Sequence, residues 1–169
     1  MPKTTIRLAM FFCIATLAVS QDALAENKGV VHVETVRYLS YEQGKVKENQ
    51  IQNNAMRPIL LEQGVSEIFT EEIIHALSSM GLTVVSSSDR TVQGTIKTLS
   101  VDDSGPLVDY RMKIGFELLT GKNKNSVYSK SFTSFRRQRK APFARKMASR
   151  MIRDCVKNFV RDARKKGVL

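Results

Sequence analysis

The clearest pattern in the chain is a strict alternation of apolar and polar residues over Val108–Leu119. Its apolar side chains occupy every second position: Val108, Tyr110, Met112, Ile114, Phe116 and Leu118. A period of two predicts a strand with one buried side and one solvent-facing side. The turn GKNKN follows, and then a second predicted strand over Ser126–Phe135. The two strands therefore form a predicted hairpin whose apolar face must be covered by other elements.

Two amphipathic helices are predicted, one on each side of the hairpin. The first spans Val65–Met80, where apolar residues recur at three- and four-residue steps, and Gly81 follows as its C-cap. The second spans about 142–166, with Pro142 in its first turn. Its apolar stripe consists of Phe143, Met147, Met151, Cys155, Phe159 and Ala163. We expect both stripes to cover the apolar face of the sheet.

Three further strands are predicted over Gly29–Tyr38, Leu82–Ser86 and Thr91–Val101. Gly94 lies inside the last of them, where a glycine marks a bulge or a close approach of another segment. The polar stretch Leu39–Asn54, within an insert at residues 39–60, is expected to be a long loop or a poorly ordered insert. Its later part is expected to dock on the body through Ile51, Met56, Ile59 and Leu60. The order strand, insert, helix, strands, helix predicts an α+β fold, with an antiparallel sheet of about 4–5 strands and two helices on one face.

The first 25 residues have the organisation of a secretory signal. A basic start precedes an apolar run over Leu8–Val19, and small residues stand at Ala23 and Ala25. The run is shorter than the roughly 20 residues that a membrane-spanning helix needs. We therefore predict that residues 1–25 are cleaved and that residues 26–169 form a single domain in the periplasm. An uncleaved membrane anchor is the alternative.

The two cysteines have different expected fates. Cys13 lies in the apolar run directly after Phe11 and Phe12, whereas a lipid-attachment site requires small residues before its cysteine. Cys155 is then the single cysteine of the predicted mature chain, which excludes an internal disulfide. Because Cys155 lies on the apolar stripe of the last predicted helix, we expect a buried side chain. A disulfide-linked dimer and a reactive thiol are the alternatives.

Positive charge is concentrated near the C-terminus. The formal net charge is +11, and the segment Arg136–Lys166 alone holds thirteen basic and two acidic residues. Such a local field favours an anionic partner. The predicted binding residues are Arg136, Arg137, Arg139, Lys140, Arg150, Arg153, Lys157 and Arg161. A basic amphipathic helix either lies on an anionic membrane or covers the sheet with its basic face exposed. We favour the second interpretation, because the hairpin needs a cover.

The sequence contains no arrangement that indicates catalysis. No second histidine or cysteine lies near His32 to suggest a metal, and His75, near the polar edge of the first predicted helix, has no evident chemistry. Glu71 and Glu72 are adjacent, so on a helix their side chains point about 100° apart, and we expect them on the solvated surface. A nucleophile elbow, a phosphate-binding loop and a metal-ligand cluster are all missing. We therefore predict a protein that is not an enzyme and has no cofactor and no metal.

A family resemblance rests on four stretches of the chain. They are EIFTEEIIHALSSMGLTVV, VQGTIKTLSV, the hairpin DYRMKIGFELL with YSKSFTSF, and the final helix, which together cover Val65–Val160. This pattern resembles the YajG-type lipoproteins of the Gram-negative envelope. It is also similar in layout to LptE-like lipopolysaccharide-assembly lipoproteins and to auxiliary lipoproteins of envelope transport systems. Those families are usually anchored by a lipidated cysteine, which Cys13 does not provide. We therefore expect a soluble periplasmic protein with peripheral contact to the outer or inner membrane.

These observations predict a non-catalytic periplasmic accessory protein of the cell envelope. Its expected partner is an envelope assembly or transport complex or an anionic glycolipid. The alternative is a basic peripheral protein that binds an anionic membrane or a nucleic acid through its C-terminal helix. Phe132 and Phe135 next to arginines are compatible with base stacking, but the export signal opposes a nucleic-acid partner. The sequence does not predict an oligomeric state.

Overall fold

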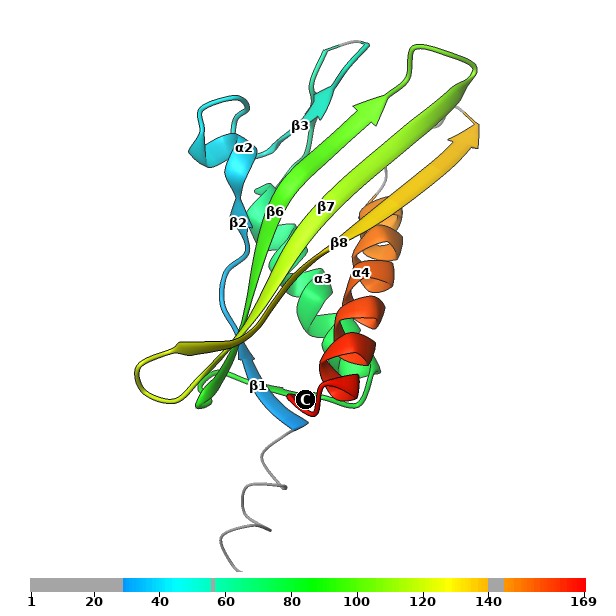
Figure 1. The fold of residues 1–169 in the computed structure, drawn as a ribbon. Coiled ribbons are helices and arrows are strands. Elements are labelled where there is room, and N and C mark those ends of the chain that lie inside the picture. The colour runs from blue at the N-terminus through cyan, green and yellow to red at the C-terminus, as the bar shows by residue number, and fades with distance from the viewer. Residues whose placement is uncertain (1–28, 56, 140–144) are drawn as a thin grey trace, which may run out of the picture.

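The computed structural model describes residues 29–55, 57–139 and 145–169, which form one sheet with two long helices against one of its faces (Figure 1). The strands are β1 (Val30–Val33), β2 (Arg37–Tyr38), β3 (Gln50–Asn53), β4 (Ile59–Leu60), β5 (Thr83–Val85), β6 (Arg90–Asp102), β7 (Leu107–Thr120) and β8 (Asn125–Arg139). The helices are α2 (Leu39–Glu42), α3 (Val65–Ser79) and α4 (Arg145–Lys165). The predicted signal at 1–25 lies outside the described residues and stays a prediction, as does the domain boundary that follows it.

Strand β6 is the axis of the sheet because four strands pair with it, along both of its edges. One edge pairs with β7 in antiparallel orientation, and β7 pairs in the same way with β8. The other edge is shared by β1, β2 and β3, which follow one another along β6 and all run parallel to it. Two short strands complete the sheet: β5 runs parallel to β1, and β4 runs antiparallel to β3.

The expected α+β class agrees with the structure, but the predicted number and direction of strands were wrong. The sheet has eight strands and is mixed instead of antiparallel. Part of the difference comes from β3 and β4, which contain four and two residues and are too short for an alternating pattern to stand out. The predicted strand Gly29–Tyr38 is two strands, separated by a break over Glu34–Val36. Within this break, the Val36 N–H has a partner in α3, because it donates to Thr70 Oγ1 at 2.9 Å.

The polar insert at 39–60 is not the long loop that the sequence predicts. It contains α2, β3 and β4, and it adds two strands to the sheet. Tyr38 is buried, and its hydroxyl donates to the Gln50 carbonyl at 3.1 Å. The expected docking of the insert is confirmed at Ile51, which is fully buried between polar neighbours in the sequence, and Ile59 packs against the core, whereas Leu60 is exposed. Met56 lies outside the described residues. A single apolar residue in a polar stretch is enough to dock a short strand, but it leaves no periodic signal.

The core lies between the sheet and the two long helices, and the alternation in β7 is confirmed. All six of its apolar positions from Val108 to Leu118 are buried. The described part of the α4 stripe is buried as well, comprising Met147, Met151, Cys155, Phe159 and Ala163. Phe159 stacks on Phe116 with 4.8 Å between ring centroids, and the Tyr128 ring meets it edge-on at 5.5 Å. Helix α4 therefore covers the sheet, which is the interpretation that the sequence favours.

Both long helices end on a glycine in the left-handed region. Gly81 follows α3 with φ of 81°, and the Leu82 N–H reaches back to the Leu77 carbonyl at 3.2 Å. Gly167 ends α4 in the same way, and this arrangement satisfies carbonyls that the last helical turn leaves unpaired. The predicted first turn of α4 around Pro142 lies outside the described residues. None of the described helices is long and apolar enough to cross a membrane.

Candidate anionic-partner site

The solvent-facing side of α4 carries only basic side chains. Every exposed α4 residue in the described range from Lys146 to Lys165 is a lysine or an arginine: Lys146, Arg150, Arg153, Lys157, Arg161, Arg164 and Lys165. Helical periodicity places them opposite the buried stripe. Within the described part of the chain, no carboxylate forms an ion pair with Arg150, Arg153 or Lys157. These three charges are therefore available to a partner.

The two acidic residues of α4 turn toward β8 and away from this basic face. Asp154 accepts hydrogen bonds from the Arg136 guanidinium and from Ser134 Oγ, the latter at 3.4 Å. Asp162 accepts from the Tyr128 hydroxyl at 2.7 Å and from Lys130 Nζ at 3.0 Å. Both carboxylates are thus engaged at the seam between helix and sheet. They bind α4 to β8 and leave the outer charges largely uncompensated.

The hydrogen bonds at Asp162 also set its protonation. The Tyr128 hydroxyl and the Lys130 ammonium stabilise the carboxylate, so the pKa of Asp162 lies below its ordinary value. Burial raises the pKa of the Tyr128 phenol, and the neighbouring Asp162 charge adds to that shift. Both groups therefore keep the charge states that their hydrogen bond needs across the neutral range.

We expect the Asp162 interactions to make the stability of the fold depend on acid pH. A carboxylate whose pKa is lowered by folding stabilises the protein above its unfolded pKa, and that contribution is lost as the pH falls through the folded pKa. Asp162→Asn should therefore reduce the free energy of unfolding at pH 7, and the difference from the unsubstituted protein should shrink below about pH 4. Urea denaturation at several pH values measures this. A difference that stays constant from pH 7 to pH 2 would contradict the assignment.

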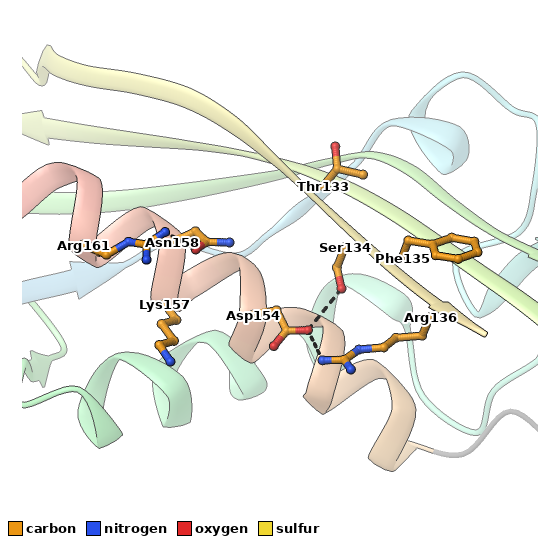
Figure 2. Close-up of a pocket in the computed structure, with 8 residues that line it drawn as sticks. All are labelled: Thr133, Ser134, Phe135, Arg136, Asp154, Lys157, Asn158 and Arg161. Atoms are coloured by element: carbon orange, nitrogen blue, oxygen red, sulfur yellow. Dashed lines mark hydrogen bonds and ion pairs between the residues drawn. The ribbon is translucent and has the colours of Figure 1, made fainter. Parts of the chain in front are cut away.

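An open groove of about 470 Å³ lies between β8 and α4 (Figure 2). It is lined by Thr133, Ser134, Phe135, Arg136, Asp154, Lys157, Asn158 and Arg161. The predicted binding residues Arg136, Lys157 and Arg161 come together here. Sequence reasoning missed Ser134 and Asn158, because uncharged polar residues of this kind give no pattern until the helix is docked on the strand.

The arginines of β8 do not form one cluster. The strand continues to Arg139 instead of ending at Phe135, so alternation sends Arg136 toward α4 and places Arg137 and Arg139 on the open face of the sheet. Arg137 forms a two-pronged ion pair with Asp109, with Nε–Oδ1 at 2.5 Å and Nη2–Oδ2 at 2.7 Å. This pair holds the pKa of Asp109 below its usual value. Lys140 lies outside the described residues.

The other side chains considered for chemistry give no assembled site. Cys155 is fully buried, as predicted, and burial raises the pKa of its thiol to about 12. Glu71 and Glu72 are partly buried and have interaction partners, instead of standing on the solvated surface. Among the described residues, no three histidine, cysteine or acidic side chains are grouped so that they could hold a metal ion.

Comparisons with known proteins show similar folds but do not indicate a function. No protein-family model matches the chain, and no similar sequence is found among curated proteins. Protein XCC0632 from Xanthomonas campestris, of the DUF330 family, has a TM-score of 0.54 and 12% identity over 76% of this chain and 77% of its own. Protein CT253 from Chlamydia trachomatis has a TM-score of 0.52 and 14% identity over 78% of this chain and 95% of its own.

A weaker structural likeness extends to a bacterial lipoprotein. GNA1162 from Neisseria meningitidis matches with a TM-score of 0.42 and 9% identity over 79% of this chain and 99% of its own. At these identities the likeness concerns the fold alone. The specific resemblance to YajG-type or LptE-like lipoproteins is not confirmed.

Proposed function

We propose that this protein is a non-catalytic accessory protein of the bacterial cell envelope that holds an anionic envelope component against the basic face of α4. The signal-like residues at 1–25 support export to the periplasm. The α+β fold supplies a rigid frame in which α4 is fixed by its buried stripe. The protein would thus act by binding, with the chemistry left to its partners.

The observation that carries this proposal is the separation of charge on α4. Its exposed residues are all basic, whereas both of its acids are held by β8. Charges arranged in this way add up along one face instead of cancelling. Near an anionic surface, each basic residue contributes about 1 kcal/mol of attraction, which falls off within a Debye length.

The burial of the apolar stripe limits what α4 can do at a membrane. Met151, Cys155 and Phe159 have no exposed surface, so this side of the helix cannot enter a bilayer while the fold is intact. Contact with lipid would then be electrostatic, through headgroups. This favours a partner that presents several negative charges over a partner that needs an inserted helix.

Neutralising four charges on the face should abolish capture of the partner. We expect a variant with Arg150→Gln, Arg153→Gln, Lys157→Gln and Arg161→Gln to lose crosslinks to envelope components that the unsubstituted protein forms in intact cells. If each charge contributes about 1 kcal/mol, the combined loss in affinity is several hundredfold or more. The measurement is crosslinking in the native envelope followed by identification of the captured components.

A control variant removes the same charge elsewhere. Lys45, Lys47, Arg57 and Lys122 are exposed and lie outside the basic face, so their replacement by glutamine should leave capture unchanged. Equal loss in both variants would mean that only net charge matters. If the unsubstituted protein captured no envelope component, or the four-residue α4 variant captured it equally well, the proposal would be overturned.

A further inference from the structure

Strand β8 has a free edge along the groove. In the part of the chain that the structure describes, β8 pairs with β7 alone, so every second residue turns its backbone N–H and C=O away from the sheet. Four consecutive residues, Thr133 to Arg136, line the groove. Successive side chains of a strand point to opposite faces. A groove that touches all four therefore runs along the edge of the strand, not under one face.

The opposite wall of the groove is the basic helix. Lys157, Asn158 and Arg161 of α4 line it (Figure 2). The acid in the groove, Asp154, is engaged by Arg136 and Ser134, and Lys157 and Arg161 leave a surplus of positive charge beside the strand edge. A strand edge next to a helix is an arrangement in which proteins bind an extended peptide as an added strand.

On the open face of the sheet, next to the same strand edge, Phe135 offers an apolar contact. The Phe135 side chain is 50% exposed. The guanidinium carbons of Arg111 and Arg137 lie 5.9 and 5.7 Å from its ring centroid. An added strand would set every second side chain beside Phe135 and the alternate ones toward α4. The two faces of such a strand would thus meet different chemistry.

We infer that the β8–α4 groove binds an extended polypeptide segment in which acidic and apolar residues alternate, and that this segment adds to β8 as a further strand. The inference rests on the proposed function and names its anionic partner as a protein segment. Acidic side chains would face Lys157 and Arg161, and apolar ones would pack on Phe135. A second copy of β8 is a poor occupant, because its own edge carries Lys130, Arg136, Arg137 and Arg139, and like charges opposite one another are unfavourable.

A designed peptide tests the inference with the full chain, purified from cells that export it. The probe is a ten-residue peptide that alternates glutamate and valine. Two further versions carry N-methyl groups on one or the other alternate set of backbone nitrogens, and a fourth has lysine in place of glutamate. We expect the unmodified peptide to bind, one methylated version to bind about tenfold or more weakly, and the lysine version not to bind. Hydrogen exchange should show protection of amides within Thr133–Arg136.

Substitutions in the groove provide the matching test on the protein. The double variant Lys157→Gln with Arg161→Gln should bind the unmodified peptide about tenfold or more weakly than the unsubstituted protein does. The control variant Lys45→Gln with Lys47→Gln should bind it with unchanged affinity. If both methylated peptides bound as tightly as the unmodified one, charge alone would explain binding, and strand addition would be overturned while the proposed function stands.

Other occupants give distinct results. Vesicles of phosphatidylglycerol that bind the protein when the peptide does not would overturn the inference and leave a lipid as the anionic partner. Dimerisation that depends on the β8 edge, measured by sedimentation, would overturn it in favour of a second copy. If peptide and vesicles both failed to bind and no envelope component were captured in cells, the proposed function would fall as well.

Discussion

Phe159→Ala should lower the free energy of unfolding by about 3–5 kcal/mol. Phe159 is fully buried in α4, stacks on Phe116 of β7 at 4.8 Å and meets the Tyr128 ring of β8 at 5.5 Å. Its removal opens a cavity at the point where the helix and both strands of the hairpin meet. The basic face is positioned by the same helix, so loss of this contact also loosens the site.

The contrast with Phe135 makes this prediction specific. Phe135 is half exposed on the open face of the sheet, so Phe135→Ala should cost less than about 1 kcal/mol. Phe159→Leu keeps most of the apolar volume, so its effect should lie between the two, and it serves if the alanine variant does not fold. Urea denaturation followed by circular dichroism measures all three. Equal effects at Phe135 and Phe159 would contradict the position of Phe159 in the core.

The long elements of this fold could be predicted because each repeats its pattern many times. The alternation over Val108–Leu119 and the periodic stripes of α3 and α4 identified β7, α3 and the C-terminal end of α4 close to their observed bounds. The same periodicity predicted that Cys155 is buried and that Arg150 and Arg153 are exposed. These positions depend only on the geometry of one element and on which side meets the core.

Strands β3 and β4 and the parallel pairing of β1, β2 and β5 could not be predicted, because tertiary contacts create them. Strands β1, β2 and β3 lie along β6 through two or so backbone pairs each, and a stretch such as QIQN has no intrinsic preference for a strand. The sequence therefore predicted a sheet with fewer strands than the observed eight, all of them antiparallel. Strands of this length are held by backbone pairing with β6 or with a strand that pairs with β6.

The basic character of the site could be predicted from the sequence, but the faces on which its side chains lie could not. The sequence showed a cluster of basic residues, yet it did not show that Arg136 and Arg137 lie on opposite faces of β8. That separation depends on the strand continuing to Arg139. Nor did it show that Asp154 and Asp162 turn to the seam, which leaves the outer face of α4 uncompensated. Both facts follow from how the helix is docked on the sheet.

Gly94→Val should destabilise the protein by about 1–3 kcal/mol, although valine favours strands. Gly94 lies on the inner side of β6, and an added Cβ there would stand 3.1 Å from Val36 Cγ2 and 3.3 Å from Ile73 Cδ1. The sequence predicted a bulge or a close approach at this glycine, and the structure shows the close approach, while the register shift lies between Ile96 and Thr98. The two further methyl groups of valine would push α3 away from β6.

A second glycine in the same sheet separates crowding from strand preference. Gly115 of β7 lies on the open face, where an added Cβ would meet Lys97 Cε at 2.9 Å, near the end of a flexible side chain that can move aside. Gly115→Val should therefore be close to neutral or slightly stabilising, since the entropy cost of glycine in a strand is removed. Urea denaturation of both variants decides the matter. If Gly94→Val were as well tolerated as Gly115→Val, the inner face of β6 would have room beside α3, and the tight packing of this helix on the sheet would be wrong.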